Sequence, residues 1–251
     1  MRSITATLQV RMNSQRLPGK VLMPISGKPM LLYLINRLEK SRYIDKLIVC
    51  TTTNRSDNEI EKICNKNNII CFRGSENDVL ERIYLAASKY NSKINLEFWG
   101  DSPLVDFRII DKYIEFFEKN INDIDLLTNY LKTSFPPGFE FIMYKFKYLE
   151  LAHKNIEKDN SLREHPGQCV LKQSIRKVNI EAPNELNYPD LYFEIDSIED
   201  YDVLRNITKI CELEYGEFFS ILDLIKIANK NEGIVARNKN VRRKWKEFRK
   251  E

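Results

Sequence analysis

A cluster of basic residues follows the first apolar run of the chain, and its residue types could bind phosphate. Arg11, Arg16 and Lys20 fall within ten residues of one another. Pro18-Gly19 imposes a turn between them, which brings backbone amides close to a ligand. The run before them, residues 4–10, is rich in β-branched and apolar residues and predicts a buried strand. A loop in this position suits a polyphosphate, because guanidinium and ammonium groups match its charge.

The spacing of this loop matches neither a Walker loop nor the G-x-G-x-x-G fingerprint of dinucleotide sites. A phosphate site therefore depends on its Arg and Lys side chains and on the turn. A basic surface loop that only connects two elements explains the same composition, because most charge clusters are solvated. The residues of the loop leave both interpretations open.

Two aspartates each come at the end of a predicted strand. Residues 94–99 form an apolar run that leads into Asp101, and residues 191–196 form another that ends at Asp196. Strand ends gather at one edge of a parallel sheet, so the two carboxylates could lie together there. Mg²⁺ takes one or two protein carboxylates and fills its other positions with water and substrate phosphates. A turn or N-cap aspartate before Pro103 is the alternative reading of Asp101.

Strand and helix patterns alternate through the first seventy residues. An amphipathic helix begins at residues 28–30, with Arg37 on its polar side, and residues 46–52 form the next strand. Residues 56–59 have the spacing of a capping box that starts a second helix, and a strand follows at residues 69–72. This alternation predicts a mostly parallel sheet covered on both faces, with ligands at the carboxyl ends of the strands.

The remaining chain continues this pattern and then departs from it. The patterns predict helices over residues 79–90 and 106–120 and strands over 94–99 and 125–129. The segment 130–190 changes character and is interpreted as an excursion from the main sheet, suited to substrate selection and dimer contacts. Ser197 and Asp200 resemble a helix cap. Two further helices are predicted over residues 218–229 and 241–251. The last is basic, and we interpret it as a solvated amphipathic helix.

Composition describes an ordinary soluble protein. Apolar residues make up 43% and charged residues 30% of the 251, and the net charge is +4, which is too mild to indicate a nucleic-acid partner. Five cysteines without a C-x-x-C pair indicate a reducing cytoplasm. We found no apolar run long enough to cross a membrane and no signal-peptide pattern.

The basic loop resembles the opening signature of the spore-coat polysaccharide cytidylyltransferases, which are relatives of the CMP-Kdo and CMP-sialic acid synthetases. The residues that carry this resemblance are Q-V-R-M-N-S-Q-R-L-P-G-K-V-L. Later motifs occur in the order found in that family: F-R-G-S-E-N-D-V-L-E-R, G-D-S-P-L-V-D, F-P-P-G-F-E, R-E-H and Y-F-E-I-D-S-I-E-D-Y. The resemblance covers residues 4 to about 210. It implies a three-layer α/β/α, Rossmann-like nucleotidyltransferase (GT-A-like) fold in one domain, residues 1–251. Residues 130–190 would form a small inserted arm, and residues 237–251 a basic helix.

The resemblance also implies roles for individual residues. The catalytic residues would be Arg11, Lys20 and Asp101. The ligands of Mg²⁺, with Mn²⁺ as an alternative metal, would be Asp101 and Asp196. The nucleotide would contact Arg11, Ser14, Arg16, Lys20, Thr51, Arg73, Asn77, Asp78, Arg82 and Asp101. The acceptor would contact Glu140, Arg163, Glu164 and His165.

The implied reaction is Mg²⁺-dependent transfer of CMP from CTP to an acidic sugar, a nonulosonic or related sugar acid, in a cytoplasmic homodimer. Alternatives are a phosphate- or phosphonate-bearing acceptor, and a non-catalytic nucleotide-binding subunit. His165 is either a general base or a structural hydrogen-bonding residue, since metal coordination could itself activate the acceptor hydroxyl. The chain departs from the family at Asn13, where Gly is usual, at Ser102, and at H-P-G-Q after Glu164. The last departure leaves the acceptor open.

Overall fold

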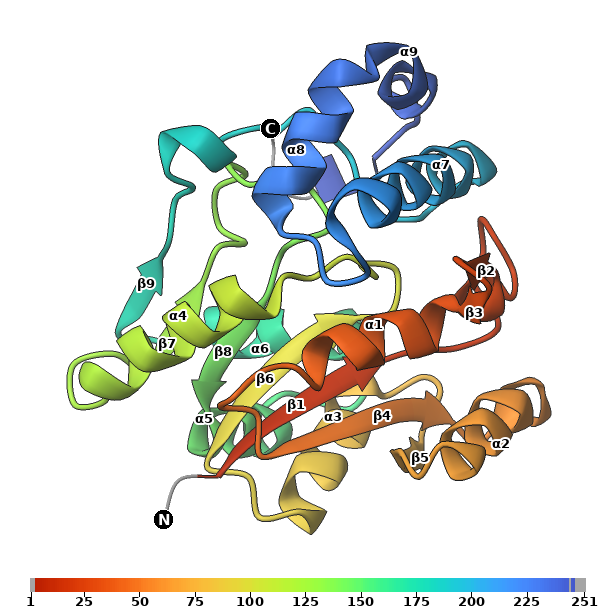
Figure 1. Ribbon diagram of the computed structural model, residues 1–251. Helices are drawn as coiled ribbons and strands as arrows, with labels where there is room; N and C mark the ends of the chain where they lie inside the picture. Colours follow the sequence, from red (N-terminus) through yellow and green to blue (C-terminus); the bar gives the residue numbers. More distant parts are fainter. Residues whose placement is uncertain (1–2, 244, 247–251) are drawn as a thin grey trace.

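A mixed sheet of seven strands forms the centre of the described part of the chain, residues 3–243 and 245–246 of a computed structural model (Figure 1). Across the sheet the strands are β5 (Ile70–Gly74), β4 (Lys46–Thr52), β1 (Ile4–Gln9), β6 (Ile94–Trp99), β8 (Ile142–Lys145), β7 (Leu126–Thr128) and β9 (Lys177–Asn179). The first four are parallel, β8 is antiparallel to both neighbours, and β9 is parallel to β7. The predicted mostly parallel sheet is confirmed.

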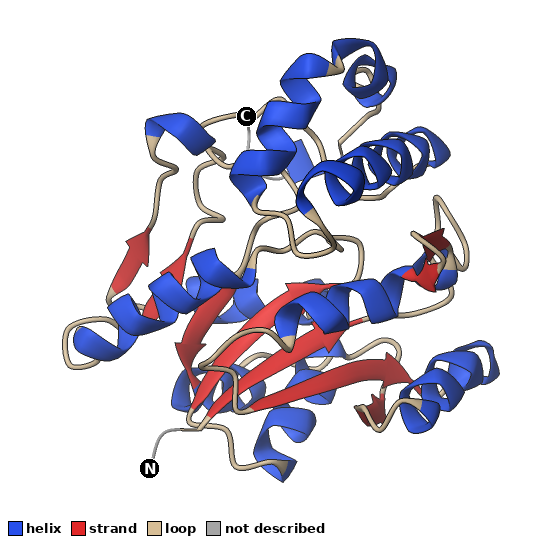
Figure 2. Cartoon of the chain, in the orientation of Figure 1, coloured by secondary structure: helices blue, strands red, loops and turns tan. Residues whose placement is uncertain are grey.

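Helices cover both faces of this sheet (Figure 2). One hydrophobic cluster includes buried residues of α1 (Met30–Leu38), α2 (Asn58–Lys66) and α4 (Phe107–Lys119). A second includes those of α3 (Val79–Lys89), α5 (Phe146–Asn155) and α6 (Pro166–Leu171). The other elements are the hairpin β2 (Pro24–Ile25) and β3 (Lys28–Pro29), and the helices α7 (Ile198–Tyr215), α8 (Ile221–Lys230) and α9 (Glu232–Val235). Among the described residues, no helix has the length and apolar character needed to cross a membrane.

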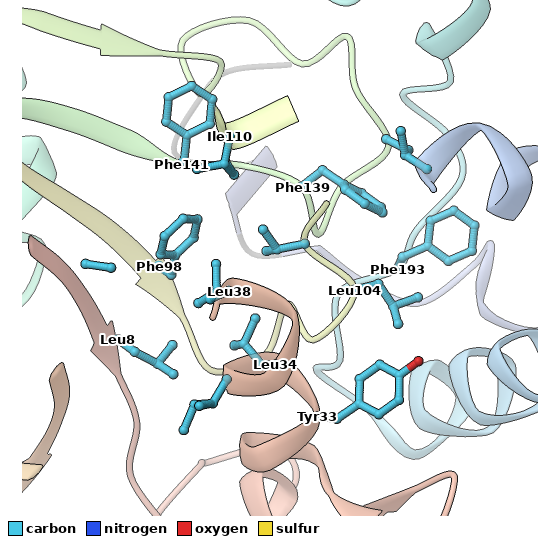
Figure 3. Packing of buried hydrophobic residues seen from close by; sticks show 14 of the residues in the cluster. Leu8, Tyr33, Leu34, Leu38, Phe98, Leu104, Ile110, Phe139, Phe141 and Phe193 are labelled. Atoms are coloured by element: carbon cyan, nitrogen blue, oxygen red, sulfur yellow. The ribbon is translucent and has the colours of Figure 1, made fainter. Parts of the chain in front are cut away.

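Side chains that alternate along β1 and β6 fill the larger cluster. Leu8 of β1 and Phe98 of β6 point toward Leu34 and Leu38 of α1 (Figure 3). All four are at most 1% exposed, and burying a side chain of this size stabilises a fold by about 1.5–3 kcal/mol. This packing holds β1 and β6 rigidly side by side, and the loops that follow them carry Lys20 and Asp101.

Arg37 corrects the prediction that it lies on the polar side of its helix. It is 1% exposed. Its guanidinium donates to the carbonyls of Val105, Glu217 and Phe219 at 2.8–3.0 Å. The loop after β6 and the connection between α7 and α8 cover this side of α1. A helical period alone could not reveal that cover.

The segment 130–190 leaves the sheet for only part of its length. It contributes β8, which pairs directly with β6, and the edge strand β9. Between them, α5 and α6 join the cluster that includes α3. Sequence order alone could not show that β8 returns to the middle of the sheet.

Residues 191–196 do not form the predicted strand. Two isolated backbone hydrogen bonds join this segment to distant loops, from Phe193 N to Pro137 O and from Ile195 N to Asp101 O, both at 2.8 Å. The segment crosses loops rather than a neighbouring strand, so a ladder cannot form. Of the predicted C-terminal helix, residues 241–243 are not helical and residues 245–246 are helical, while the rest lies outside the described residues.

Candidate active site

The carboxyl ends of the parallel strands bring several loops together at one edge of the sheet. The basic loop (residues 10–20) follows β1, and residues 100–106 follow β6. The segment 194–197 reaches the same place, because Ile195 N donates to Asp101 O. The two candidate aspartates therefore meet although 95 residues separate them.

Lys20 forms the centre of this arrangement. Its Nζ donates to Ile195 O at 2.6 Å, and to Asp101 Oδ2 and Asp196 Oδ1 at 3.0 Å each. Burial by itself would lower the pKa of this ammonium, but the carboxylates of Asp101 and Asp196 outweigh it and raise the pKa. Lys20 is therefore held as a cation between the two aspartates.

Arg16 pairs with the other carboxylate oxygen of Asp196. Its Nη2 lies 2.7 Å from Asp196 Oδ2. The loop turns between Arg16 and Lys20 at Gly19, whose φ of 74° lies in the left-handed region that favours glycine. Arg16 and Lys20, two of the three cations of the basic loop, are thus paired with the carboxylates that are candidates for metal binding.

These oxygens suit a divalent cation. In the described residues, no group of three or more His, Cys, Asp or Glu side chains could hold a metal. Nevertheless, three oxygen atoms already surround one cation, the Lys20 ammonium, at 2.6–3.0 Å. Mg²⁺ is commonly bound by one or two carboxylates, with water and phosphate completing its shell. Asp101 and Asp196 therefore fit Mg²⁺ once Lys20 moves toward another anion.

A buried network that the sequence did not reveal supports Asp196. Asp200 Oδ2 accepts from Asp196 N at 3.0 Å and from Ser197 N at 2.9 Å. Arg243 pairs with both oxygens of Asp200, at 3.0 and 2.6 Å. The cap formed by Ser197 and Asp200 is confirmed. Arg243, expected in a solvated helix, is instead only 4% exposed.

Arg82 is a buried cation beside the basic loop. It is 4% exposed, and its Nη1 donates to Ser75 O. Its Nε has no hydrogen-bond partner in the described part of the chain. Burial lowers the pKa of Arg82, and repulsion from Arg11 lowers it further. Arg11 is exposed. The two guanidinium groups create a positive region that an anion would stabilise.

Arg73 and Thr51, both expected near the nucleotide, bond within the protein. Arg73 donates to Thr52 O at 2.9 Å and to Asn54 O at 2.8 Å, and pairs with Glu61 at 2.7 Å. Its guanidinium therefore braces the turn after β4. Thr51 is buried and donates to Asp57 Oδ2 at 2.9 Å. Ser14 and Asn77, by contrast, lie half-buried and exposed, respectively.

Asp78 and Arg163 are bonded to each other. Arg163 Nε and Nη2 donate to Asp78 Oδ2 at 3.0 and 2.8 Å, and its Nη1 donates to Ile156 O at 2.7 Å. The other oxygen of Asp78 accepts from Glu81 N and caps α3. Arg163 is 2% exposed, so its guanidinium joins α3 to the segment after α5 and does not face an open acceptor site.

Comparisons with known proteins identify the family. The model of the cytidylyltransferase family matches residues 5–215. The chain belongs to the cytidylyltransferase family. It is 31% identical to a cytidylyltransferase of Leptospira borgpetersenii, with a TM-score of 0.85, over 97% of this chain and 100% of the other. The enzyme is thus a nucleotidyltransferase.

More distant relatives of this cytidylyltransferase add detail. The spore coat polysaccharide biosynthesis protein SpsF of Bacillus subtilis is 27% identical, over 92% of this chain and 96% of its own. The structure of a CMP:2-keto-3-deoxy-manno-octonic acid synthetase complexed with CTP has a TM-score of 0.62 at 14% identity, over 83% and 99% of the two chains. The second likeness confirms the predicted Rossmann-like fold.

The residues expected on the acceptor side of this cytidylyltransferase differ in accessibility. Glu164 and His165 are exposed. Glu140 is half-buried and accepts from Gly138 N at 2.7 Å. Nearby, Glu194 accepts from Trp245 Nε1 at 2.6 Å, and burial, with the charge of Glu140 adding to it, raises its pKa to about 8. Sequence analysis missed Glu194, although it lies within the Y-F-E-I-D motif.

Asp57 is a further residue whose role differs from the prediction. The predicted capping box at residues 56–59 is not formed, because Asp57 is the N-cap of α2 and no side chain caps that helix. Ser56 Oγ is buried without a hydrogen-bond partner among the described residues. The Asp57 carboxylate instead turns toward the basic loop and the end of β4. The same S-x-x-E spacing fits both arrangements, so the sequence could not distinguish them.

Proposed function

We propose that this cytidylyltransferase transfers CMP from CTP to an acidic sugar, a nonulosonic or related sugar acid, and releases pyrophosphate. The contact of Lys20 with both Asp101 and Asp196 carries the proposal. In this contact the Lys20 ammonium, which would bind phosphate, lies between the two carboxylates that would bind a metal. The synthetase complexed with CTP and the spore coat polysaccharide protein support the substrate classes.

CTP would replace the anions that the basic loop now uses. Arg16 and Lys20 are paired with aspartates, and triphosphate oxygens are equivalent partners for them. Arg11 and Arg82 supply further positive charge on the same side, and the Nε of the buried Arg82 has no hydrogen-bond partner among the described residues. When Arg16 and Lys20 move to the phosphates, Asp101 and Asp196 become available to a metal.

Mg²⁺ bound there would neutralise the triphosphate and polarise the α-phosphate. Lys20 would lie beside the α-phosphate and stabilise the charge that develops as the acceptor oxygen attacks phosphorus. The new bond joins that oxygen to the α-phosphorus, and the bond from the α-phosphorus to pyrophosphate breaks. The proton of the acceptor hydroxyl leaves it during the attack, and His165 is exposed and could receive it.

The acceptor would approach from the segment 130–190. Glu140, Glu164 and His165 are at least partly accessible, whereas Arg163 is buried against Asp78. We therefore assign Arg163 a positioning role between the nucleotide loop and the acceptor segment. The same segment is the proposed contact surface of a homodimer.

Pyrophosphate release tests the proposal. The enzyme is incubated with Mg²⁺, each common ribonucleoside triphosphate in turn, and pools of sugar acids, sugar phosphates and phosphonates. We expect release only with CTP and a sugar-acid pool. Release with a phosphate or phosphonate pool would replace the acceptor class. Tight CTP binding with no release from any pool would favour a non-catalytic nucleotide-binding subunit.

A further inference from the structure

One buried carboxylate joins the basic loop to the end of the neighbouring strand. Asp57 is 1% exposed. Its Oδ1 accepts from Met12 N at 2.8 Å. Its Oδ2 accepts from Thr52 N at 3.1 Å and from the hydroxyls of Thr51 and Thr52 at 2.9 and 2.5 Å. Four donors from two chain segments thus converge on a group that can only accept.

Met12 is the residue at which the basic loop closes on itself. Its carbonyl accepts from Ser14 N at 2.9 Å and from Gly19 N at 2.8 Å. Its amide has no partner there and is the group that Asp57 binds. Because Gly19 directly precedes Lys20, an unbroken series of contacts leads from Asp57 through Met12 to the Lys20 ammonium.

We propose that Asp57 is a positioning residue for CTP binding, which holds the basic loop in the conformation that presents its cations to the triphosphate. This inference rests on the proposed function. Asp57 does not itself reach the ligand, because its carboxylate is covered and both oxygens are already bonded. Its effect passes through the backbone of Met12, so it changes the preorganisation of the loop and not its charge.

Asparagine at position 57 cannot accept all the hydrogen bonds that the Asp57 carboxylate accepts. If its oxygen faces Met12 N, its amide group faces the Thr52 N–H, and two donors oppose each other. If it is flipped, the donors oppose each other at Met12. Either way the N–H of Met12 or of Thr52 loses its acceptor. We expect this loss to shift the conformational equilibrium of the basic loop about tenfold.

The test compares Asp57→Asn with Asp111→Asn. Asp111 is also buried, and it accepts from Ser41 Oγ at 2.5 Å and from Arg42 N at 3.1 Å, in the turn before the opposite end of β4. Both variants lose a charge from a buried carboxylate that fixes a turn. CTP binding with Mg²⁺ is measured by calorimetry, and amide exchange by mass spectrometry of the peptide that spans residues 11–20.

We expect Asp57→Asn to weaken CTP binding about tenfold and to accelerate exchange in the basic loop. Asp111→Asn should bind CTP like the wild type and lose only thermal stability. Thr52→Val, which removes one hydroxyl bond to Asp57, gives a milder version of the same test if Asp57→Asn does not fold. Unchanged CTP binding and loop exchange in Asp57→Asn would overturn the inference alone. A wild-type enzyme that binds no CTP would overturn the proposed function as well.

Discussion

The Lys20 ammonium lies between the carboxylates of Asp101 and Asp196, where a metal ion bound to both would also lie. At an effective dielectric constant of about 20, unit charges about 4 Å apart interact by about 4 kcal/mol, and the partial exposure of Asp101 reduces that figure. Under the proposed function, a divalent ion at these carboxylates would compete with the Lys20 ammonium until a nucleotide drew the ammonium away. Metal affinity and nucleotide affinity should therefore reinforce each other.

Replacing the ammonium should make the free enzyme bind metal more tightly. In Lys20→Met the two carboxylates keep their positions but lose their cation, so we expect Mn²⁺ to bind at least about tenfold more tightly without CTP. Electron paramagnetic resonance of Mn²⁺ measures this directly. Lys28→Met is the control, because Lys28 pairs with Glu217 at 2.6 Å and not with the candidate metal ligands. Equal Mn²⁺ affinity in Lys20→Met and the wild type would show that Lys20 does not hold the metal position.

Glu97, on β6 below the site, should make stability depend on pH. Its carboxyl is fully buried and accepts from the Tyr144 hydroxyl and from Gln9 Nε2, and burial raises its pKa from 4.5 to about 7. The folded state therefore keeps a proton that the unfolded chain releases at lower pH. Its contribution to the free energy of unfolding should fall by about 3 kcal/mol as pH rises from about 4.5 to about 7.

The difference in the free energy of unfolding between the wild type and Glu97→Gln isolates the contribution of the Glu97 carboxyl, because glutamine does not titrate. Urea unfolding of both proteins across this range should give a wild-type advantage that shrinks as the pH rises. A wild-type advantage that grows with pH would mean that the hydrogen bonds to the carboxylate outweigh its burial.

At the scale of the elements, α7 and the residues after α9 hold the backbone of Asp196 in place. The side chains of Arg243 and Asp200 are at most 2% exposed and form a pair with two hydrogen bonds, 2.6 and 3.0 Å long. Arg243→Ala leaves the Asp200 charge buried without this partner, so the free energy of unfolding should drop by about 3 kcal/mol or more. Pyrophosphate release should fall with it, because Asp200 binds the amide of Asp196.

Arg205→Ala is the matched control on α7. Arg205 is half exposed and lies 3.8 Å from Asp202, so its loss should change the free energy of unfolding by less than about 1 kcal/mol. Urea unfolding measures both variants. Equal stability of the two would contradict a structural role of the C-terminal residues.

The elements also show what the sequence could and could not predict. The helices and parallel strands of the first half follow from periodicity, and the cap of α7 follows from the residue types at Ser197 and Asp200. Residues 191–196 look like a strand because apolar residues gather there, but they have no neighbouring strand to pair with. Asp57 and Arg243 support the site through contacts across 45 and 43 residues, which no local pattern encodes.

At the scale of the whole molecule, the site is a product of the sheet topology. The parallel strands β1 and β6 pair along their whole length, so the loops that carry Lys20 and Asp101 must lie side by side. The segment before α7 then crosses this edge and adds Asp196. The fold therefore accounts for the meeting of Lys20, Asp101 and Asp196, while family motifs were needed to propose which reaction these three groups serve.

The most direct test of the account measures Mg²⁺-dependent pyrophosphate release from CTP, with its acceptor, in Asp101→Asn and Asp196→Asn. Each variant removes one charge from the pair that Lys20 now bridges. We expect both to lose about a hundredfold or more of the rate while their thermal unfolding shows a folded protein. Wild-type turnover in either variant would contradict the assignment of this carboxylate pair as the centre of CMP transfer.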